Sequence, residues 1–160
     1  MRSAVGRAAL ALSLLLALGP ALPSEPVTAY GGPIVRYATA KSFADVIFDL
    51  NFAITEHNLR ITGRNTIGEG LRERGYSDFP DVEVIHFCSL ELAREVLLID
   101  PGFVAQMPCR ITVHEQDGET VISLILLPLD HADARVNAFA RRMNGMLTDI
   151  VHFVVAPQGE

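Results

Sequence analysis

Two alternating runs of residues meet at Asp117-Gly118, and they restrict the fold more than any other stretch of the chain. Residues 110–116 and 119–127 alternate apolar and polar side chains, with the period of half-buried β-strands. Asp-Gly between two such runs favours a two-residue type I′ turn. The sequence therefore predicts a β-hairpin in a fixed register.

That register assigns a face to each side chain of the hairpin. It places Cys109 opposite Leu126 on the predicted core face, and His114 opposite Val121 on the other face. Cys109 and His114 therefore cannot ligate the same metal ion in a regular hairpin.

The remaining pattern predicts a two-layer α+β domain. Period-two alternation predicts strands at residues 34–39, 59–64 and 82–88. Apolar residues at helical spacing predict helices from Phe43 to about His57, from Leu90 to Ile99 and from His131 to about Val155. The expected order is β-α-β-β-α-β-β-α, with an antiparallel sheet and helices on one side.

Three local expectations accompany this pattern. Asp130 is the expected N-cap of the last helix, and Gly145 within that helix is expected to mark a close backbone contact. Arg60 and Arg64 are expected on one strand face, where they either hold an anion or simply face solvent.

The N-terminus has the parts of a secretory signal. Arg2 and Arg7 precede or flank a short apolar run at residues 8–18, which Gly19-Pro20 ends. The run is shorter than the roughly 20 residues of a spanning helix, although an uncleaved anchor is the alternative. We expect a signal peptide at residues 1–29, a leader and first strand at 30–41, one domain at 42–156 and a tail at 157–160, in a periplasmic or secreted protein.

Charge limits the partners. The 160-residue chain has a formal net charge of −6, which becomes −7 if residues 1–29, with Arg2, Arg7 and Glu25, are removed. An acidic domain with one lysine is a poor partner for nucleic acid or anionic lipid, and we expect no stable membrane insertion after cleavage.

Both cysteines lie at strand ends around the helix predicted at 90–99. Cys88 ends one strand, two residues after His86 on the same face, and Cys109 opens another, just after Met107. Thiol, thioether and imidazole groups form a soft donor set that suits copper(I) or zinc. Cys88, Cys109, His86 and Met107 are therefore the candidate binding or redox residues.

Several cofactor chemistries lack their motifs in this sequence. It contains no Cys-x-x-Cys-His for covalent haem, no dinucleotide or phosphate-loop fingerprint, and no Gly-x-Ser-x-Gly or His-Glu-x-x-His. The cofactor, if any, is unspecified, and we expect no covalent haem and no nucleotide.

Two segments resemble a known family. FPDVEVIHFCSLELAREVLLIDP (79–101) and MPCRITVHEQDGETVISLILLP (107–128) are similar to the family called domain of unknown function 302, over about residues 42–128. One branch continues through an Asn-x-x-Leu helix like that at residues 144–147. This chain departs from that branch at Ser89, where asparagine is expected.

The resemblance implies a compact fold of the TATA-binding-protein-like kind, often a homodimer, without an established reaction. Relatives occur exported and beside cytochrome or sulfur-oxidation modules, which favours a periplasmic redox partner.

Four interpretations of the cysteines remain open. A Cys88–Cys109 disulfide closes a loop that is worth roughly 3 kcal/mol in the chain-entropy model. The alternatives are free packed thiols, a site for a soft metal or sulfur compound, and an enzyme that uses Cys88 at the helix start. An exported, non-catalytic binding or accessory module is the leading functional expectation, ahead of an enzyme.

Overall fold

The computed structural model describes residues 33–156. The predicted signal peptide at 1–29, the leader residues 30–32 and the tail at 157–160 lie outside the described residues.

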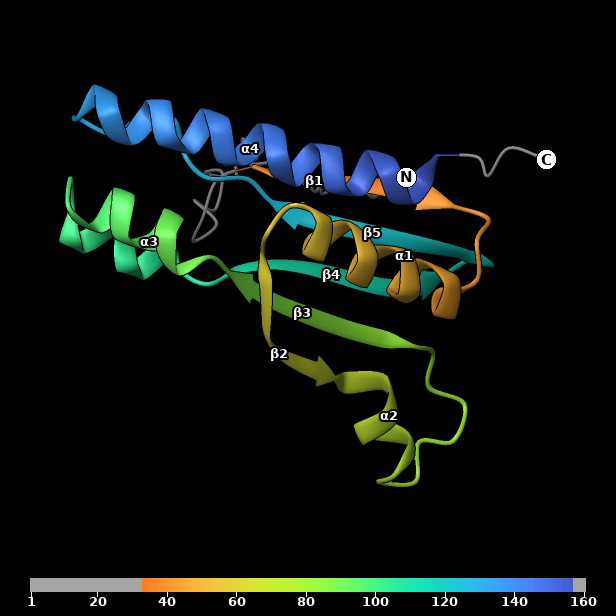
Figure 1. The fold of residues 1–160 in the computed structure, drawn as a ribbon. Coiled ribbons are helices and arrows are strands. Elements are labelled where there is room, and N and C mark those ends of the chain that lie inside the picture. Colours follow the sequence, from red (N-terminus) through yellow and green to blue (C-terminus); the bar gives the residue numbers. More distant parts are fainter. Residues whose placement is uncertain (1–32, 157–160) are drawn as a thin grey trace, which may run out of the picture.

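Five antiparallel strands form one sheet in the order β1-β5-β4-β3-β2 (Figure 1). The strands are β1 (Ile34–Thr39), β2 (Arg60–Thr66), β3 (Val82–Cys88), β4 (Cys109–Gln116) and β5 (Glu119–Ile125). The predicted α+β class, with an antiparallel sheet, is confirmed.

The two long helices, α1 (Phe43–Glu56) and α4 (Ala134–Val155), lie side by side on one face of the sheet (Figure 1). The helix α3 (Leu90–Leu97) and the 3-10 helix η1 (Pro101–Gln106) lie at one end of the sheet, next to the first half of α4. The short helix α2 (Ile67–Arg72) follows β2. In the described part of the chain, no helix covers the opposite face of the sheet.

Two apolar clusters form the interior. The larger one lies between the sheet and the α1–α4 layer and includes Leu50, Ile85 and Ile150. The smaller one joins α3, η1 and the first half of α4, where the rings of Phe103 and Phe139 meet edge to face at 5.7 Å. The smaller cluster fixes the end of the sheet where both cysteines lie.

The β4–β5 hairpin has the predicted register. Val113 pairs with Ile122 and His114 pairs with Val121. Asp117 and Gly118 both have positive φ, at 53° and 82°, as a type I′ turn requires.

The start of α4 differs from the prediction. The N-cap is Asp133, whose side chain accepts a hydrogen bond from Arg135 N–H, and not Asp130. The residues just before it do not continue the helix, because the Asn137 side chain accepts from the N–H of His131 and donates to its carbonyl. Those bonds occupy backbone groups that a helix turn would otherwise use.

Among the described glycines, the one with a close backbone contact is Gly68, and not Gly145. A Cβ at Gly68 would lie 2.5 Å from the Pro80 carbonyl oxygen and 2.8 Å from Val82 N, whereas nothing lies within 4 Å of one at Gly145. The absence of a side chain at Gly68 lets α2 pack directly on the chain that enters β3.

A β-bulge separates the two arginines of β2. The pairing with β3 shifts between Ile61 and Gly63, so Arg64 lies opposite the buried Ile85 on the helix-covered face. There it bonds Glu83 and the Asn51 side chain of α1. Arg60 and Arg64 therefore do not form a shared anion site, because the extra residue reverses the alternation of faces.

Candidate functional site

The sheet register brings the two cysteines to the same end of the sheet. Cys109, the first residue of β4, lies directly opposite Phe87 on β3, and Cys88 is the next residue after Phe87. Ser89 then caps α3 by accepting a hydrogen bond from Leu92 N–H at 3.4 Å. Cys88 thus lies where the strand turns into the helix.

A small, partly open cavity of about 30 Å³ lies at this end of the sheet, between α3, η1 and α4. Its walls are almost entirely apolar, and they include four sulfur-containing side chains. The lining residues are Leu59, Phe87, Cys88, Ser89, Leu92, Ala93, Phe103, Gln106, Met107, Cys109, Leu127, Phe139 and Met143.

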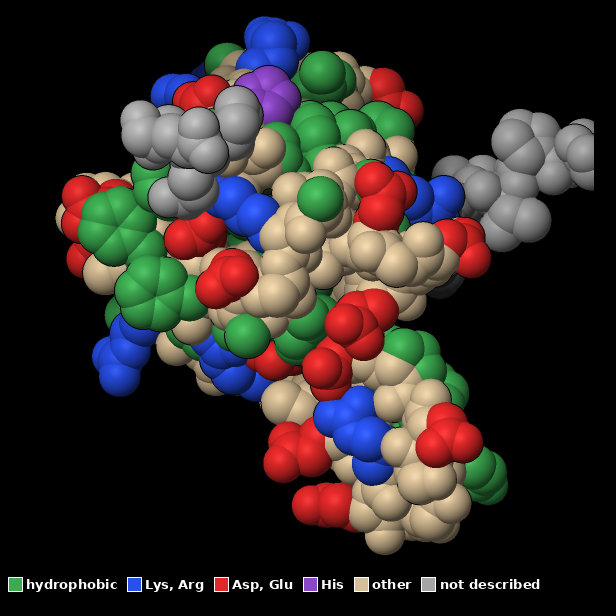
Figure 2. Space-filling model, turned by 90° about the vertical axis from the view of Figure 1, so that its right-hand side faces the viewer, with side chains coloured by type: hydrophobic (Ala, Val, Ile, Leu, Met, Phe, Trp, Pro, Cys, Tyr) green, Lys and Arg blue, Asp and Glu red, His purple; other side chains and the backbone are tan. Residues whose placement is uncertain are grey.

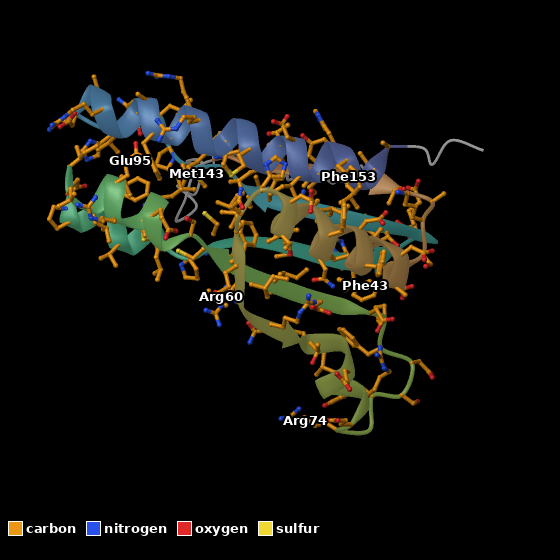
Figure 3. All side chains as sticks on the ribbon, in the orientation of Figure 1. Phe43, Arg60, Arg74, Glu95, Met143 and Phe153 are labelled. Atoms are coloured by element: carbon orange, nitrogen blue, oxygen red, sulfur yellow. The ribbon has the colours of Figure 1, made fainter. Side chains whose placement is uncertain are left out.

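Sequence reasoning named three of the four sulfur residues. Cys88, Cys109 and Met107 line the cavity as a group, and Met143 completes the set. Met143 projects from α4 toward α3 (Figure 3). Met143 was missed because it lies within the apolar stripe of a long helix, where its spacing indicates ordinary core packing. Only the packing of α4 against the sheet end reveals its neighbours.

His86 is not part of this cavity. It lies on the open face of the sheet, and its Nε2 is 2.8 Å from Asn65 Oδ1 on β2. His114 also lies on the open face, with Nε2 3.3 Å from Gln116 Oε1. The hairpin argument that separated His114 from Cys109 agrees with these positions.

The environment of Cys109 disfavours its thiolate. Burial raises the pKa of the Cys109 thiol to about 11, and the nearby Cys88 adds to the increase, against a smaller lowering effect from Arg110. Cys109 is therefore a neutral thiol at neutral pH. A nucleophilic cysteine needs the opposite shift, so Cys109 is poorly suited to that role.

The two cysteines are free thiols in this structure. The Cys88 Sγ–H group lies 3.6 Å from the Ser89 carbonyl oxygen. Cys109 pairs with Phe87, so both side chains point to the same face of the sheet. In a regular ladder Cys88, one residue after Phe87, would point to the opposite face. A Cys88–Cys109 disulfide stays a prediction, and it would require the end of β3 to turn inward.

Cys88 also borders a second, shallower hollow on the outside of the sheet end. This hollow includes Arg60, the cross-strand partner of Cys88, and Glu91 at the start of α3. Cys88 therefore lines both the sulfur-lined cavity and a solvent-facing hollow, and Cys109 likewise borders another hollow beside Arg110.

Asn144 holds one wall of the cavity in place. Its side chain accepts from Leu127 N–H at 2.7 Å and donates to the Leu127 carbonyl at 2.9 Å. These two bonds satisfy the backbone of Leu127, a lining residue, where the chain leaves β5. This contact gives the Asn-x-x-Leu segment a structural role that spacing alone does not reveal.

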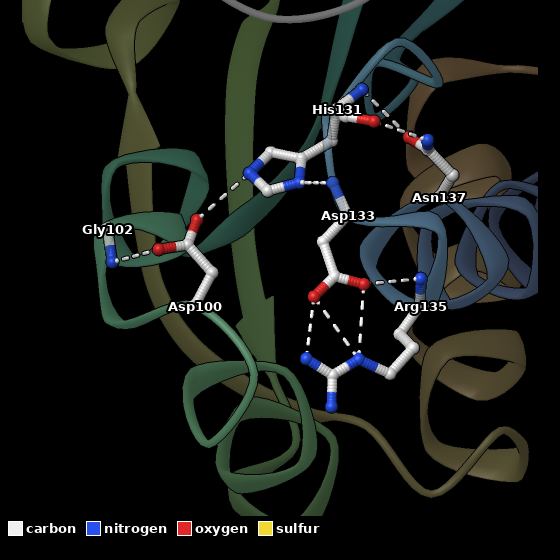
Figure 4. A network of polar contacts seen from close by, with 6 residues as sticks. All are labelled: Asp100, Gly102, His131, Asp133, Arg135 and Asn137. Carbon is white, nitrogen blue, oxygen red and sulfur yellow. Dashed lines mark hydrogen bonds and ion pairs between the residues drawn. The ribbon is translucent and has the colours of Figure 1, made fainter.

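A polar network ties η1 to the start of α4 (Figure 4). His131 Nε2 lies 3.3 Å from Asp100 Oδ2, and His131 Nδ1 accepts from Asp133 N–H at 3.0 Å. Arg135 donates hydrogen bonds to Asp133 and lowers the pKa of that carboxyl to about 2. Both nitrogens of His131 are thus engaged, so this Asp–His pair positions the chain and has no free nitrogen for general base chemistry.

Clusters of the side chains that most often bind metals are absent from the described residues. No cluster of three or more His, Cys, Asp or Glu side chains within residues 33–156 could hold a metal ion. Among residues 33–156, no helix is long and apolar enough to cross a membrane.

These features define a small α+β domain with an open antiparallel sheet and a sulfur-lined cavity at one end. The chain belongs to the family described as "Domain of unknown function DUF302", whose model matches residues 35–150. No curated protein matches the chain.

A solved structure supports the fold. The chain is similar to the "uncharacterized conserved protein DUF302 from Bacillus stearothermophilus", with a TM-score of 0.68 and 16% sequence identity. The likeness covers 76% of this chain and 97% of that one. At this identity it shows a shared fold and nothing about the ligand.

Proposed function

We propose that this protein is an exported, non-catalytic binding module whose cavity holds one soft metal ion, with copper(I) as the best match. The observation that carries the proposal is that Cys88, Cys109, Met107 and Met143 line a single cavity. Thiolate and thioether ligands select copper(I) over harder ions.

The volume of the cavity favours an ion over an organic ligand. Pockets for drug-sized molecules measure roughly 300–1,000 Å³. A volume of about 30 Å³ holds about two water-sized groups, since one needs roughly 10–15 Å³. A single ion bound by the lining sulfur atoms fits this space.

The donor set favours copper(I) over zinc. Structural zinc sites use four ligands drawn mostly from cysteine and histidine. His86 faces the other side of the sheet and bonds Asn65, which leaves only two thiols of that type at the cavity. Methionine supports copper(I) and contributes little to zinc binding.

Binding would release protons from the thiols. A metal ion binds the thiolate, and burial raises the pKa of Cys109 to about 11. At any pH below that value, ligation of Cys109 expels one proton. Apparent affinity should therefore rise with pH through the neutral range.

The experiment is an anaerobic titration of reduced, metal-free protein with copper(I) against a competing chelator. We expect one equivalent to bind, and we expect Cys88→Ser or Cys109→Ser to weaken binding by at least about 100-fold, because each removes a charged ligand. Met107→Leu and Met143→Leu should weaken it less. Met146→Leu is the matched control, because Met146 packs near both apolar clusters without lining the cavity.

Two results would contradict the metal proposal. One is no copper(I) binding by protein that shows two thiols after denaturation. The other is a lack of titratable thiols in protein purified without reductant, which would favour the disulfide instead.

Export is a separate part of the proposal, and it rests on the basic and apolar segments of residues 1–29. Cell fractionation with N-terminal sequencing tests it. The expected product begins near Tyr30 in the exported fraction, and full-length protein in the cytosol would contradict the proposal.

A further inference from the structure

The face of the sheet that carries no helix has a distinct composition. Cross-strand partners in an antiparallel sheet point to the same side, so the pairings define what this face presents. One row crosses all five strands: Arg36, Ser123, Thr112, Val84 and Asn65. The flanking rows hold Ala38, Val121, His114 and Val82 on one side, and Ile34, Ile125, Arg110 and His86 on the other.

The formally charged residues within the three rows are two arginines, Arg36 and Arg110, although the chain has a formal net charge of −6 with histidine counted as neutral. The ionisable residues within the three rows are Arg36, Arg110, His86 and His114. The nearest carboxylates lie at its margins, in Asp117 and Glu119 at the hairpin end and in Glu91 beyond Arg60. The face is a basic surface on an acidic protein.

The arginines of this face have no internal partners. The six ion pairs formed within residues 33–156 include Arg64, Arg72, Arg135 and Arg142, but they do not include Arg36, Arg60 or Arg110. Arg36, Arg60 and Arg110 are exposed, and Arg60 extends away from the helix layer (Figure 3). Exposed cations without partners are available to pair with a ligand.

We propose that this open face docks an acidic polypeptide segment of a partner protein. The guanidinium groups of Arg36 and Arg110 pair with its carboxylates, and Val84, Val121 and Ile125 pack against its apolar side chains. Thr112 and Asn65 supply hydrogen-bonding groups between them. The proposal is independent of the metal site.

Nucleic acid fits this face less well. Proteins that bind single strands on an open sheet stack bases on aromatic side chains, and the three rows contain no Phe, Tyr or Trp. The negative charge of the rest of the chain would also repel a long polyanion. A second copy docked face to face would oppose arginine with arginine, which costs binding energy.

The test uses a fluorescent peptide of about ten residues with alternating Glu and Val, since about six extended residues span the roughly 20 Å width of five strands. Lys-Val peptide is the charge control, and a single-stranded DNA of equal charge is the competitor. Amide shifts of ¹⁵N-labelled protein locate the bound peptide.

We expect saturable binding of the Glu-Val peptide, weaker in higher salt, with shifts centred on β4 and β5. Arg36→Glu with Arg110→Glu should weaken binding by about tenfold or more. Arg94→Glu with Arg141→Glu, two exposed helix arginines that also lie outside the ion pairs, should change it less than about twofold. Unchanged urea midpoints show that the variants fold.

Several results would overturn the proposal. They are no measurable binding at millimolar peptide, shifts that map to the α1–α4 layer, equal losses in both arginine pairs, or tighter binding of the DNA on the same face. Self-association of the protein through this face at the concentrations used in the titration would also overturn it.

Discussion

The Cys109 thiol should make stability depend on pH in the alkaline range. Its pKa rises from 9.0 to about 11 in the folded state. Since the folded-state value is the higher one, the stabilisation is fully present below pH 9 and is lost as the pH rises through 11. At pH 11 the loss amounts to about 2 kcal/mol of the free energy of unfolding.

Urea unfolding at pH 8, 10 and 11 measures this loss. The gap in unfolding free energy between wild type and Cys109→Ala should narrow by about 2 kcal/mol over that range. All other ionisable groups are present in both proteins, so the comparison isolates the contribution of Cys109. A constant gap would contradict the raised pKa.

Two glycines should respond in opposite directions to alanine. Gly145→Ala should stabilise the protein by up to about 1 kcal/mol, because the position is open and lies within a helix. Gly68→Ala should destabilise it by more than that, because the new Cβ would overlap the Pro80 carbonyl. Thermal melts of the two variants decide this, and a destabilised Gly145→Ala would contradict the description of α4.

At the scale of elements, α4 is joined to the chain before it by two asparagines seven residues apart. Asn144 bonds both backbone groups of Leu127, and Asn137 bonds both backbone groups of His131. The first contact is partly buried and the second is exposed. The partly buried Asn144 contact should therefore contribute more to the free energy of unfolding than the exposed Asn137 contact.

Asn144→Ala should cost about 1–3 kcal/mol, because it leaves the Leu127 backbone groups partly buried without partners. Asn137→Ala is the control. It brings the same gain in helix propensity as Asn144→Ala, while water can replace the exposed hydrogen bonds that it removes. The difference in urea midpoint measures the buried contact. Equal effects for the two variants would show that the Asn144 contact adds nothing.

How far the sequence predicts the fold varies from element to element. The β4–β5 register followed from one two-residue turn, because such a turn leaves a single pairing. The face of Arg64 was predicted wrongly because the strand was treated as regular. Gly63 within it is the type of residue that marks a bulge, and the pairing with β3 places the bulge there. The start of α4 was misplaced for a similar reason, since the bonds from Asn137 to His131 come from six residues away.

The candidate site was predictable only where local pairing in the hairpin decides the position of a residue. Cys109 was assigned to the core face by the hairpin, and Cys88 and Met107 by their position beside it. His86 was grouped with them because it shares a strand face with Cys88, but the cavity opens on the other side of the sheet. Tertiary packing alone adds Met143.

At the scale of the whole molecule, the helix layer carries an exposed aromatic patch. Phe48, Phe52 and Phe153 are 72%, 51% and 47% exposed, and the rings of Phe52 and Phe153 lie 5.6 Å apart. Figure 2, seen from the end remote from α3, shows hydrophobic side chains interrupting the charged surface. Clustered aromatics of this kind favour association between molecules.

Phe48→Gln with Phe52→Gln should therefore reduce self-association, with a change in stability of no more than about 0.5 kcal/mol for each surface site. Sedimentation velocity across a concentration series measures the first effect and urea unfolding the second. Arg36→Glu with Arg110→Glu should leave self-association unchanged. A wild-type protein that stays monomeric at high concentration would contradict both this expectation and the homodimer.

The bulge in β2 has a consequence for comparing relatives. One extra residue near Thr62 decides whether the following side chains point to the helices or to the open face. A relative that lacks it would place its equivalent of Arg64 outside and lose the bonds to Glu83 and Asn51. Family alignments should therefore show a one-residue gap here, and relatives with the gap should lack the Arg–Glu pair as well.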